Sequence, residues 1–452
     1  MGEVLTSVGL DVGTTTTQMI LSRLEVENRG SSFSVPEMVI DRRQVVYRSP
    51  VYFTPLLGKD RVDGEKIRQI VAQEYEKAGL RREEVDTGAI IITGETSRKE
   101  NAAAVLEALS GFAGEFVVAT AGPDLESVLA AQGAGAVEYA ARTGEAVLHM
   151  DIGGGTSNLA LIRDGKVEKT GCLNVGGRLV KLTEDGVVTY VSPVLEGLCS
   201  WKLGQRITKE DVERLAEMLT QALEMAAGLR EKTELLEKLW TVESSQLPLP
   251  LRGTPLINAG GGNAVISFSG GVADCIEKEC FWQEFGDIGP VLGKKIRESR
   301  LCQGKYRLGS ETIRATVIGA GCHSVQLSGS TVFYQNVRFP MKNLPVVTEA
   351  AQLDRLDGPG VLAMPGIPGA SYGQVQRLAE ELAEKWSQQP VLIAMEADMA
   401  KALGCALALR LGKERPILCI DRVRLQGGDY LDVAAPVGPA MPVVVKTLVL
   451  GR

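Results

Sequence analysis

The amino-acid sequence predicts an α/β protein built from two related lobes that face each other across a cleft. Two turns share the pattern D-x-G-x-x-T-x-[QN], at residues 11–18 and 151–158, and each joins two apolar runs. Two helical segments, at 123–143 and 310–325, carry glycines in their interiors. A length of 452 residues suits two or three domains better than one core.

The composition excludes several classes of protein. The chain is 44% hydrophobic and 23% charged, near the averages of globular proteins. Its formal charge of -7 provides no basic surface for DNA or RNA, so we expect no nucleic-acid partner. The N-terminus has no basic region before a long apolar run, and no apolar stretch is long enough to span a bilayer. We therefore expect a cytoplasmic protein without a membrane partner.

The cysteines and histidines argue against a metal cage. No C-x-x-C pair occurs, and only two histidines are present, His149 and His323. We expect His149, which lies in an apolar run before Asp151, to be packed rather than catalytic. Buried free thiols are the favoured interpretation of the eight cysteines, which are Cys172, Cys199, Cys275, Cys280, Cys302, Cys322, Cys405 and Cys419.

The first lobe is predicted over residues 1–143. Ser97 and Glu100 have capping-box spacing, which favours a capping role for Glu100. Gly133 and Gly135 are typical of a helix that another backbone approaches closely, as expected where a helix crosses between two lobes. The predicted elements are a hairpin at 7–24, a helix at 64–80, a strand at 87–96, a helix at 97–111, a strand at 116–122 and a helix at 123–143.

The second lobe is predicted over residues 144–345, and a C-terminal α/β unit packed on this lobe over 346–452. Gly319 and Gly321 repeat the close-packing role proposed for Gly133 and Gly135. The charges of the helical region at 209–240 are most simply a solvated face. Predicted elements are an antiparallel meander at 144–177 with an Asp164-Gly165 turn, a strand at 265–268, a helix at 310–325, and in the C-terminal unit a helix at 371–386 with Val375, Leu378, Leu382 and Trp386 on one stripe.

The two matched turns predict a phosphate site. Glycines and short hydroxyl residues at a hairpin turn let backbone N–H groups converge on one point, where phosphate oxygens are favoured. One such turn is also an ordinary hairpin, whereas two copies bring Asp11 and Asp151 toward the same phosphate chain, where Mg²⁺ can bridge them. Gly270 and Gly271 follow a strand and allow the backbone to lie against a purine or ribose, although such a connection is also common without a ligand.

The order of these motifs resembles that of the actin, heat-shock-70 and sugar-kinase superfamily of two-lobed ATP-binding proteins. The motifs are phosphate-1, connect-1, phosphate-2, adenosine and connect-2. The resemblance implies a two-lobed actin-like ATPase fold, with duplicated ribonuclease-H-like lobes around a nucleotide cleft and with ATP and Mg²⁺ as cofactors. A Walker-type site is excluded, because no G-x-x-x-x-G-K-[ST] occurs.

The superfamily resemblance assigns roles to individual residues. Asp11 and Asp151 would be the carboxylates linked to Mg²⁺, and Gly270 and Gly271 would flank the adenosine. No motif identifies the group that activates water, so Glu95, which follows a buried strand, and Asp151 acting through water both stay open as catalytic residues. The residues that would bind the β- and γ-phosphates are Gly13, Thr14, Thr15, Thr16, Gly153, Gly154, Gly155, Thr156 and Ser157.

A narrower resemblance concerns the ethanolamine ammonia-lyase reactivating factors. It is carried by "IITGETSRKENA", "DIGGGTSNLAL", "GCLNVGGRL", "SFSGGVADCI", "FGDIGPVLG" and "IRATVIGAG". The resemblance runs from residue 5 to about 345 and more thinly beyond, and segment 185–250 has no residue-by-residue match.

This family resemblance implies an ATP-dependent, chaperone-like protein with ATPase activity. Its partner would be ethanolamine ammonia-lyase, from which it would release damaged cobalamin so that intact adenosylcobalamin can bind. The family also implies work in ethanolamine catabolism, in the cytoplasm or with a bacterial microcompartment, and leaves a homodimer open. A small-molecule kinase and an actin-like filament protein are the alternatives within the superfamily. The scattered cysteines argue against an iron–sulfur activator of radical dehydratases.

Overall fold

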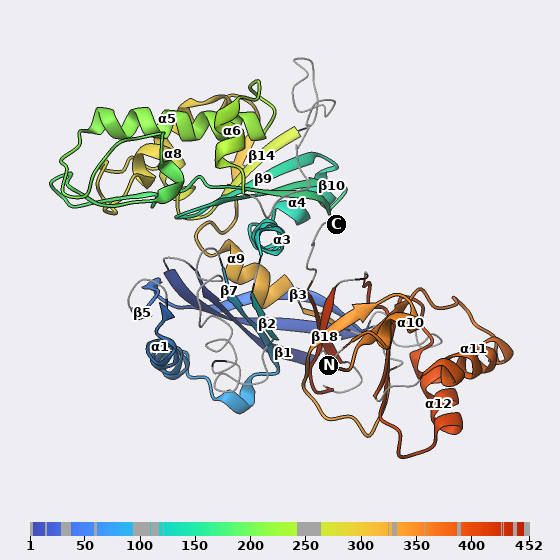
Figure 1. Ribbon diagram of the computed structural model, residues 1–452. Helices are drawn as coiled ribbons and strands as arrows, with labels where there is room; N and C mark the ends of the chain where they lie inside the picture. The colour runs from blue at the N-terminus through green and yellow to red at the C-terminus, as the bar shows by residue number, and fades with distance from the viewer. Residues whose placement is uncertain are drawn as a thin grey trace.

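The computed structural model describes residues 3–13, 16–28, 38–57, 61–93, 109, 117–120, 122–241, 264–323, 325–327, 332–356, 358–386, 390–425, 427, 429–436 and 441–446. Two lobes are stacked one above the other, and a third unit lies beside the lower lobe (Figure 1). Across these residues, no helix combines the length and apolar character needed to cross a membrane.

The first lobe contains a mixed sheet with three antiparallel and two parallel strand pairs among the described residues. Its strands are β1 (Glu3–Val12), β2 (Thr16–Asn28), β3 (Met38–Arg48), β4 (Tyr52–Phe53), β7 (Thr87–Ile92) and β8 (Val117–Thr120), with a separate pair β5 (Leu56–Leu57) and β6 (Arg61–Val62). The order is β3-β2-β1-β7-β8, with β4 paired to β2. β1 runs antiparallel to β2 and parallel to β7. The predicted hairpin at 7–24 is confirmed.

Both faces of the first sheet are buried. Helix α1 (Gly64–Lys77) covers one face and begins at Asp63, whose carboxylate accepts the Lys66 N–H at 3.1 Å. Ile90 and Ile92 of β7 belong to the core under α1, whereas Ile91 belongs to the core on the opposite face. This alternation follows the two-residue period of a strand, and burial on both faces explains why the run is continuously apolar.

The second lobe repeats the plan of the first. Its sheet contains β9 (Ala146–Ile152), β10 (Ser157–Arg163), β11 (Lys166–Leu173), β14 (Ala264–Ser269) and β15 (Tyr306–Leu308), and a further pair is β12 (Val180–Leu182) with β13 (Val188–Val191). The order β11-β10-β9-β14-β15 corresponds strand for strand to that of the first lobe, with the same antiparallel and parallel pairs. Asp164 and Gly165 both have positive φ, as the predicted turn requires. The predicted two-lobed actin-like fold with duplicated lobes is confirmed.

Two helical segments lie between the sheets. They comprise α3 (Pro123–Gly133) with α4 (Ala136–Thr143), and α9 (Ala315–Ile318) with η6 (Gly319–His323), a π-helical turn. Helix α3 follows the first lobe in the chain yet packs on β9, β10 and β11, whereas α9 and η6 follow the second lobe and pack on β1 and β2. The helices therefore cross between the lobes, as the glycines indicated.

The glycines of these helices play two different roles. A Cβ atom at Gly133 would overlap the carbonyl oxygen of Ala315, and one at Gly319 would overlap that of Leu129. At Gly321 it would lie 3.0 Å from the Cα of Gly9. Close packing is thus confirmed at these three positions. Gly135 instead has φ of +71° and separates α3 from α4, a left-handed conformation that favours glycine.

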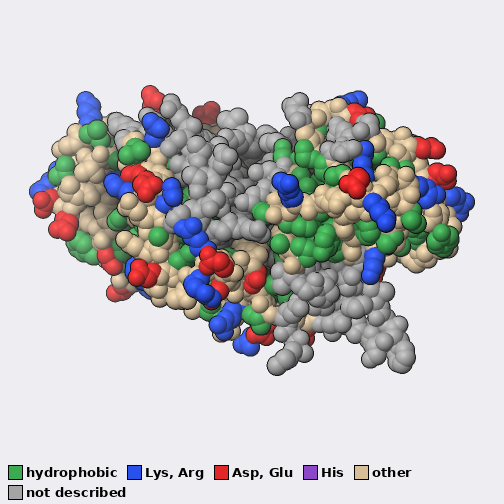
Figure 2. Space-filling view, turned by 90° about the horizontal axis from the view of Figure 1, so that it is seen from below, with side chains coloured by type: hydrophobic (Ala, Val, Ile, Leu, Met, Phe, Trp, Pro, Cys, Tyr) green, Lys and Arg blue, Asp and Glu red, His purple; other side chains and the backbone are tan. Residues whose placement is uncertain are grey.

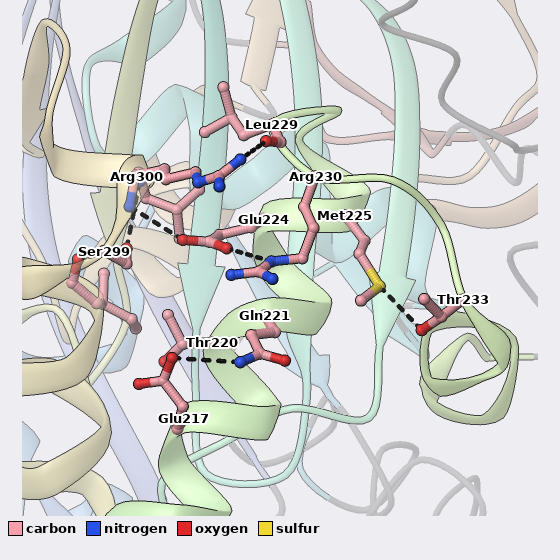
Figure 3. Close-up of polar contacts among 12 residues, drawn as sticks. Glu217, Thr220, Gln221, Glu224, Met225, Leu229, Arg230, Thr233, Ser299 and Arg300 are labelled. Atoms are coloured by element: carbon pink, nitrogen blue, oxygen red, sulfur yellow. Dashed lines mark hydrogen bonds and ion pairs between the residues drawn. The ribbon is translucent and has the colours of Figure 1, made fainter.

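Polar contacts tie the large helix of the second lobe to its neighbours. Helix α5 (Lys209–Ala226) ends near Glu224, whose buried carboxylate accepts the Arg230 Nε–H at 2.7 Å and the Arg300 backbone N–H at 3.0 Å (Figure 3). The Arg300 guanidinium donates to the Leu229 carbonyl at 2.9 Å. These bonds compensate the burial of a charge. The other helices here are α6 (Glu234–Leu239), α7 (Asp274–Glu277) and α8 (Gly289–Glu298).

The C-terminal unit is an eight-stranded sheet with helices. Its elements are β16 (Val325–Leu327), β17 (Phe333–Gln335), β18 (Met341–Val347), α10 (Ala350–Leu353), β19 (Val361–Met364), α11 (Tyr372–Lys385), β20 (Val391–Met395), α12 (Ala400–Leu411), β21 (Ile417–Ile420), β22 (Tyr430–Val433) and β23 (Pro442–Lys446). The order is β16-β23-β22-β18-β19-β20-β21-β17, with β18 to β21 parallel. Val375, Leu382 and Trp386 are buried in its core, as predicted.

The C-terminal unit begins earlier in the chain than expected, and it packs on a different lobe. Strands β16 and β17 and most of β18 precede residue 346, yet they hydrogen-bond with β23, β21 and β22. Residues 325–327 and 332–345 therefore belong to this unit and not to the second lobe. The unit lies beside the first lobe, where β16 contacts β3 and β18 contacts β8 (Figure 1). Figure 2 shows apolar side chains gathered on the right, over this unit. The expected packing on the second lobe was wrong.

Candidate functional site

A cavity of about 280 Å³ lies between the lobes, and both matched turns line it. One backbone hydrogen bond occurs at the same place in both turns. Gly13 N–H donates to the Thr16 carbonyl at 2.9 Å, and Gly153 N–H donates to the Thr156 carbonyl at 2.9 Å. The predicted site residues on this wall are Asp11, Gly13, Thr16, Asp151, Gly153, Gly154, Gly155, Thr156, Gly270 and Gly271. Thr14, Thr15 and Glu95 lie outside the described residues.

Each aspartate receives a hydroxyl hydrogen bond from the neighbouring parallel strand. Thr93, directly after β7, donates to Asp11 Oδ1 at 2.9 Å, and Ser269, the last residue of β14, donates to Asp151 Oδ1. Burial raises the pKa of Asp11 to about 7, against the Thr93 bond and with the help of the Asp151 charge. Burial likewise raises the pKa of Asp151 to about 6, against the Ser269 bond. Burial is therefore the main influence on the pKa of both carboxylates.

His149 supports the Asp151 side of the cavity from below. Its imidazole lies in the core, with Nδ1 3.2 Å from Ser267 Oγ and Nε2 2.9 Å from Ser269 Oγ. Since Ser269 donates to Asp151, the Nε2–H must donate to Ser269, and Nδ1 accepts from Ser267. Burial, with a smaller contribution from the Arg307 charge, lowers the pKa of His149 to about 3, so the ring is neutral. The sequence correctly predicted a packed histidine.

The turn of the second lobe presents unpaired backbone donors. The loop after β11 hydrogen-bonds with the carbonyl groups of this turn. Gly177 N–H donates to the Gly153 carbonyl at 3.0 Å, and Arg178 N–H donates to the Gly154 carbonyl at 2.6 Å. The N–H groups of Gly154, Gly155 and Thr156 make no backbone hydrogen bond within the described part of the chain. Consecutive free N–H groups at a turn form a nest for an anion.

Ser157 has a different place from the one expected. Its hydroxyl is buried, donates to the Val175 carbonyl at 2.7 Å, and does not line the cavity. The side chain therefore holds the loop after β11 against the turn. In the sequence, Ser157 resembles the other short hydroxyl residues of the turn, but the strand alternation directs its side chain away from that of Thr156.

The third glycine turn also reaches the cavity. Gly270 has φ of +86°, and a Cβ atom there would overlap the backbone of Ile152, so only glycine fits. Its N–H donates to the Thr312 carbonyl at 3.1 Å. The next residue, Gly271, has its nearest neighbour for a Cβ atom at 3.9 Å, the Ile313 side chain, so this side of the cavity is open. The turn thus presents bare backbone to the space above β9 and β14.

Two buried amides complete the wall and were not assigned to the site from sequence. Gln18 lies opposite Asp11 in the β1–β2 pair, and Asn158 lies opposite Asp151 in the β9–β10 pair. Gln18 Oε1 and Asn158 Oδ1 are buried and have no hydrogen-bond donor among the described residues. The matched Q and N of the repeated pattern were the available signal. An unpaired buried oxygen at the same place in both lobes indicates a missing partner.

These groups fit a hydrated Mg²⁺ ion. Two buried aspartate carboxylates and two unpaired amide oxygens are the oxygen donors that a hard cation prefers. Within the described residues, no group of three or more His, Cys, Asp or Glu side chains could hold an ion directly. Mg²⁺ usually binds to few protein ligands and keeps several of its water molecules.

Comparison with known proteins identifies the family. The family model described as ethanolamine utilisation protein EutA matches residues 3–357 and 350–451. Two relatives, each named ethanolamine ammonia-lyase reactivase EutA, are 38% identical over 476 residues (Escherichia coli strain K12) and 37% identical over 477 residues (Salmonella typhimurium strain LT2). Each comparison covers 98% of this chain and 98% of the relative.

A solved structure with similar architecture is the PPX-GPPA enzyme of Aquifex aeolicus. It is 13% identical with a TM-score of 0.41, over 70% of this chain and 99% of that chain. The family match extends over nearly the whole length of the chain, including segment 185–250, for which the motifs found no counterpart. The chain therefore belongs to the EutA family of ethanolamine utilisation proteins.

Proposed function

We propose that this chain is an ATP-dependent reactivase of ethanolamine ammonia-lyase. It would release damaged cobalamin from the inactivated lyase so that intact adenosylcobalamin can bind, in ethanolamine catabolism. The observation that supports this most directly is the identity of 38% over 98% of the chain to a relative named as such a reactivase. The cavity between the lobes, with its paired aspartates and anion nest, supports the use of a nucleotide.

The proposed mechanism assigns each group of the cavity a task. Asp11 and Asp151 would hold Mg²⁺ through its waters, and the turns at 13–16 and 153–156 would bind the phosphates. Gly270 and Gly271 would lie against the adenosine. Glu95 or Asp151 would position the water that attacks the terminal phosphate. A nucleotide that touches both lobes binds their closed arrangement better than the open one, and so shifts the equilibrium between them.

A reactivation assay tests the proposed function. Ethanolamine ammonia-lyase is inactivated as its complex with cyanocobalamin and mixed with this chain, Mg²⁺ and adenosylcobalamin. We expect deaminase activity to return with ATP and not without it, and not with the Asp11→Asn variant. ATP hydrolysis without any recovery of a matched lyase would contradict the reactivase role and return the choice to a kinase or a filament protein, which substrate-dependent turnover and ATP-dependent sedimentation distinguish.

The proposed partner and location follow from the same family membership. We propose the lyase as the client, and action in the cytoplasm with association to a bacterial microcompartment where the client is enclosed. A homodimer is the simplest assembly to test, by light scattering of the purified chain.

Replacing Ser269 with alanine is expected to impair the site through Asp151. The variant removes the hydroxyl that donates to Asp151 and leaves the Nε2–H of His149 without its acceptor. A buried donor left unpaired costs about 1–3 kcal/mol of unfolding free energy. We expect that loss in urea denaturation, with ATP hydrolysis lowered by about 10-fold, since a misplaced carboxylate weakens a positioned metal site.

The matched control is Ser267→Ala, on the same strand and against the same imidazole. Ser267 contacts His149 Nδ1 and does not line the cavity. It should lower stability while leaving hydrolysis near the wild-type rate. Equal losses of hydrolysis in both variants would show that Ser269 acts only through stability.

A further inference from the structure

The charge of the cavity is one-sided. Arg178 is the one cationic side chain among the described residues that line it. A polyphosphate chain carries more negative charge than one Mg²⁺ ion balances, so the place of this arginine is informative. The carboxylates that line the cavity are Asp11, Glu126, Asp151, Asp274 and Asp287.

The backbone of Arg178 is fixed to the turn of the second lobe. Its N–H donates to the Gly154 carbonyl at 2.6 Å, and the preceding Gly177 donates to Gly153 at 3.0 Å. At Gly176, a Cβ atom would overlap the Gly154 carbonyl, so the loop lies directly on the turn. The position of Arg178 therefore follows the position of the anion nest.

The guanidinium is held at one nitrogen. Arg178 Nε–H donates to Asp287 Oδ2 at 3.0 Å, while Asp287 Oδ1 accepts the Gly289 N–H at 2.8 Å, so the carboxylate is itself fixed. The Arg178 side chain is 22% exposed. Its Nη1 and Nη2 make no hydrogen bond or ion pair within the described ranges. Four N–H donors of a largely buried guanidinium therefore have no acceptor among the described residues.

The same guanidinium contacts the opposite lobe. Its central carbon lies 5.3 Å from the centroid of the Phe53 ring, a cation–π distance. Phe53 is on β4, directly opposite Thr16 of the first matched turn. Arg178 thus joins the turn of the second lobe to a residue beside the turn of the first.

We propose that Arg178 binds the terminal phosphate of the nucleotide and that its contact with Phe53 links this phosphate to closure of the cleft. The inference rests on the proposed function, because it takes the cavity to bind ATP. A guanidinium fork binds two phosphate oxygens at once, and Nη1 and Nη2 are the donors available for this. ADP lacks the terminal phosphate and leaves Arg178 with Asp287 and Phe53 alone. Arg178 thereby favours the closed arrangement with ATP more than with ADP.

Binding of nucleotides to purified variants tests the proposal. A non-hydrolysable ATP analogue and ADP are titrated by calorimetry, with Mg²⁺, into the wild type, Arg178→Gln, Arg178→Lys and Phe53→Leu. We expect Arg178→Gln to weaken the analogue by about 10- to 100-fold and ADP by less than about 3-fold, the range for a charge-assisted bond to phosphate. Arg178→Lys should fall between, because its charge remains but the fork is lost.

Closure provides a second readout, independent of hydrolysis. We expect the radius of gyration in solution scattering to be smaller with the analogue than with ADP for the wild type, and this difference to shrink in Arg178→Gln and Phe53→Leu. Phe53 is exposed, so its variant tests the link even if Arg178→Gln does not fold. The matched control is Arg163→Gln, whose ion pair with Glu168 lies outside the cavity and whose nucleotide binding should be unchanged.

The outcomes separate this proposal from the proposed function. Equal weakening of both nucleotides would mean that Arg178 only holds the loop through Asp287, and would overturn the proposal. If Arg178→Gln binds both the analogue and ADP as the wild type does, the proposal is overturned as well, with the proposed function intact. A wild-type chain that binds neither nucleotide would overturn both.

Discussion

Replacing Asp151 with asparagine is expected to lower Mg²⁺-dependent ATP hydrolysis by at least about 100-fold, or roughly 2.7 kcal/mol of transition-state stabilisation. The substitution removes a carboxylate from the cavity while keeping the size of the side chain, and the amide oxygen can still accept the Ser269 hydroxyl. The same loss is expected for Asp11→Asn in the first lobe, where Asp11 accepts the hydroxyl hydrogen bond of Thr93. Steady-state hydrolysis with Mg²⁺ in excess measures both effects.

Asp151→Asn should not lower the stability of the fold, although it lowers ATP hydrolysis. The pKa of Asp151 rises from 3.8 to about 6 in the folded chain, so the native state binds the proton more tightly than the unfolded state. Stability is therefore lost as pH rises between about 4 and 6, by up to roughly 3 kcal/mol in the metal-free chain. Asp151→Asn lacks this loss. At pH 7.5 in EDTA we expect the variant to be at least as stable as the wild type in urea denaturation.

The control for this prediction is Asp124→Asn. Asp124 is a partly buried aspartate of α3 that accepts the Thr170 hydroxyl and lies outside the cavity. It should hydrolyse ATP at the wild-type rate. Normal hydrolysis by both Asp11→Asn and Asp151→Asn would show that the cavity is not the nucleotide site. Lost activity together with lost stability in Asp151→Asn would show only that the fold is damaged.

The local sequence pattern was sufficient to find the two turns, but it did not reveal the residues that hydrogen-bond with their aspartates. The turns are hairpins, so their residues are neighbours in sequence, and the repeat of one pattern revealed the duplication of the lobes. Thr93 and Ser269 instead reach the aspartates from adjacent parallel strands, 82 and 118 residues away in the chain. Which strand lies beside which depends on the order of the sheet, and a short motif carries no information about that order.

Arg178 was missed for a related reason. "GCLNVGGRL" served only as one of the segments that carry the family resemblance, and nothing in its composition marks Arg178 as a binding residue. Its significance depends on contacts with Asp287 and Phe53, which lie on different elements and different lobes. The repeated Gln18 and Asn158 were visible in the pattern, but nothing in the sequence shows that their oxygens are buried without a partner.

The C-terminal unit shows the same limit at the scale of a domain. An α/β unit was predicted here, because α11, β20, α12 and β21 follow one another in the chain. Three preceding strands join the same sheet by antiparallel pairs with β21, β22 and β23. Pairing between segments about 100 residues apart leaves no local signal, so the boundary was placed about 20 residues too late.

Replacing Gly319 with alanine is expected to lower the free energy of unfolding by about 3 kcal/mol or more. The added methyl group would overlap the backbone of Leu129, which cannot move aside as the end of a side chain can. The contact is the crossing of α9 and η6 with α3, so the methyl group also pushes the lobes apart. Urea denaturation and nucleotide affinity measure the two effects. Gly373→Ala, at an exposed helix position with nothing within 4 Å, should be neutral or stabilising.

Combining Gly133→Ala with Gly319→Ala tests whether one helix–helix contact accounts for the loss of stability in both single variants. Gly133 meets Ala315 and Gly319 across the same crossing, so Gly133→Ala alone should cost about as much as Gly319→Ala. Once one methyl group has separated the helices, the second enters space that is already open. The combined loss should therefore be smaller than the sum by about 1–3 kcal/mol, as for residues that share a contact. Additive losses would mean that each glycine serves its own helix, and that the crossing of the helices does not set the distance between the lobes.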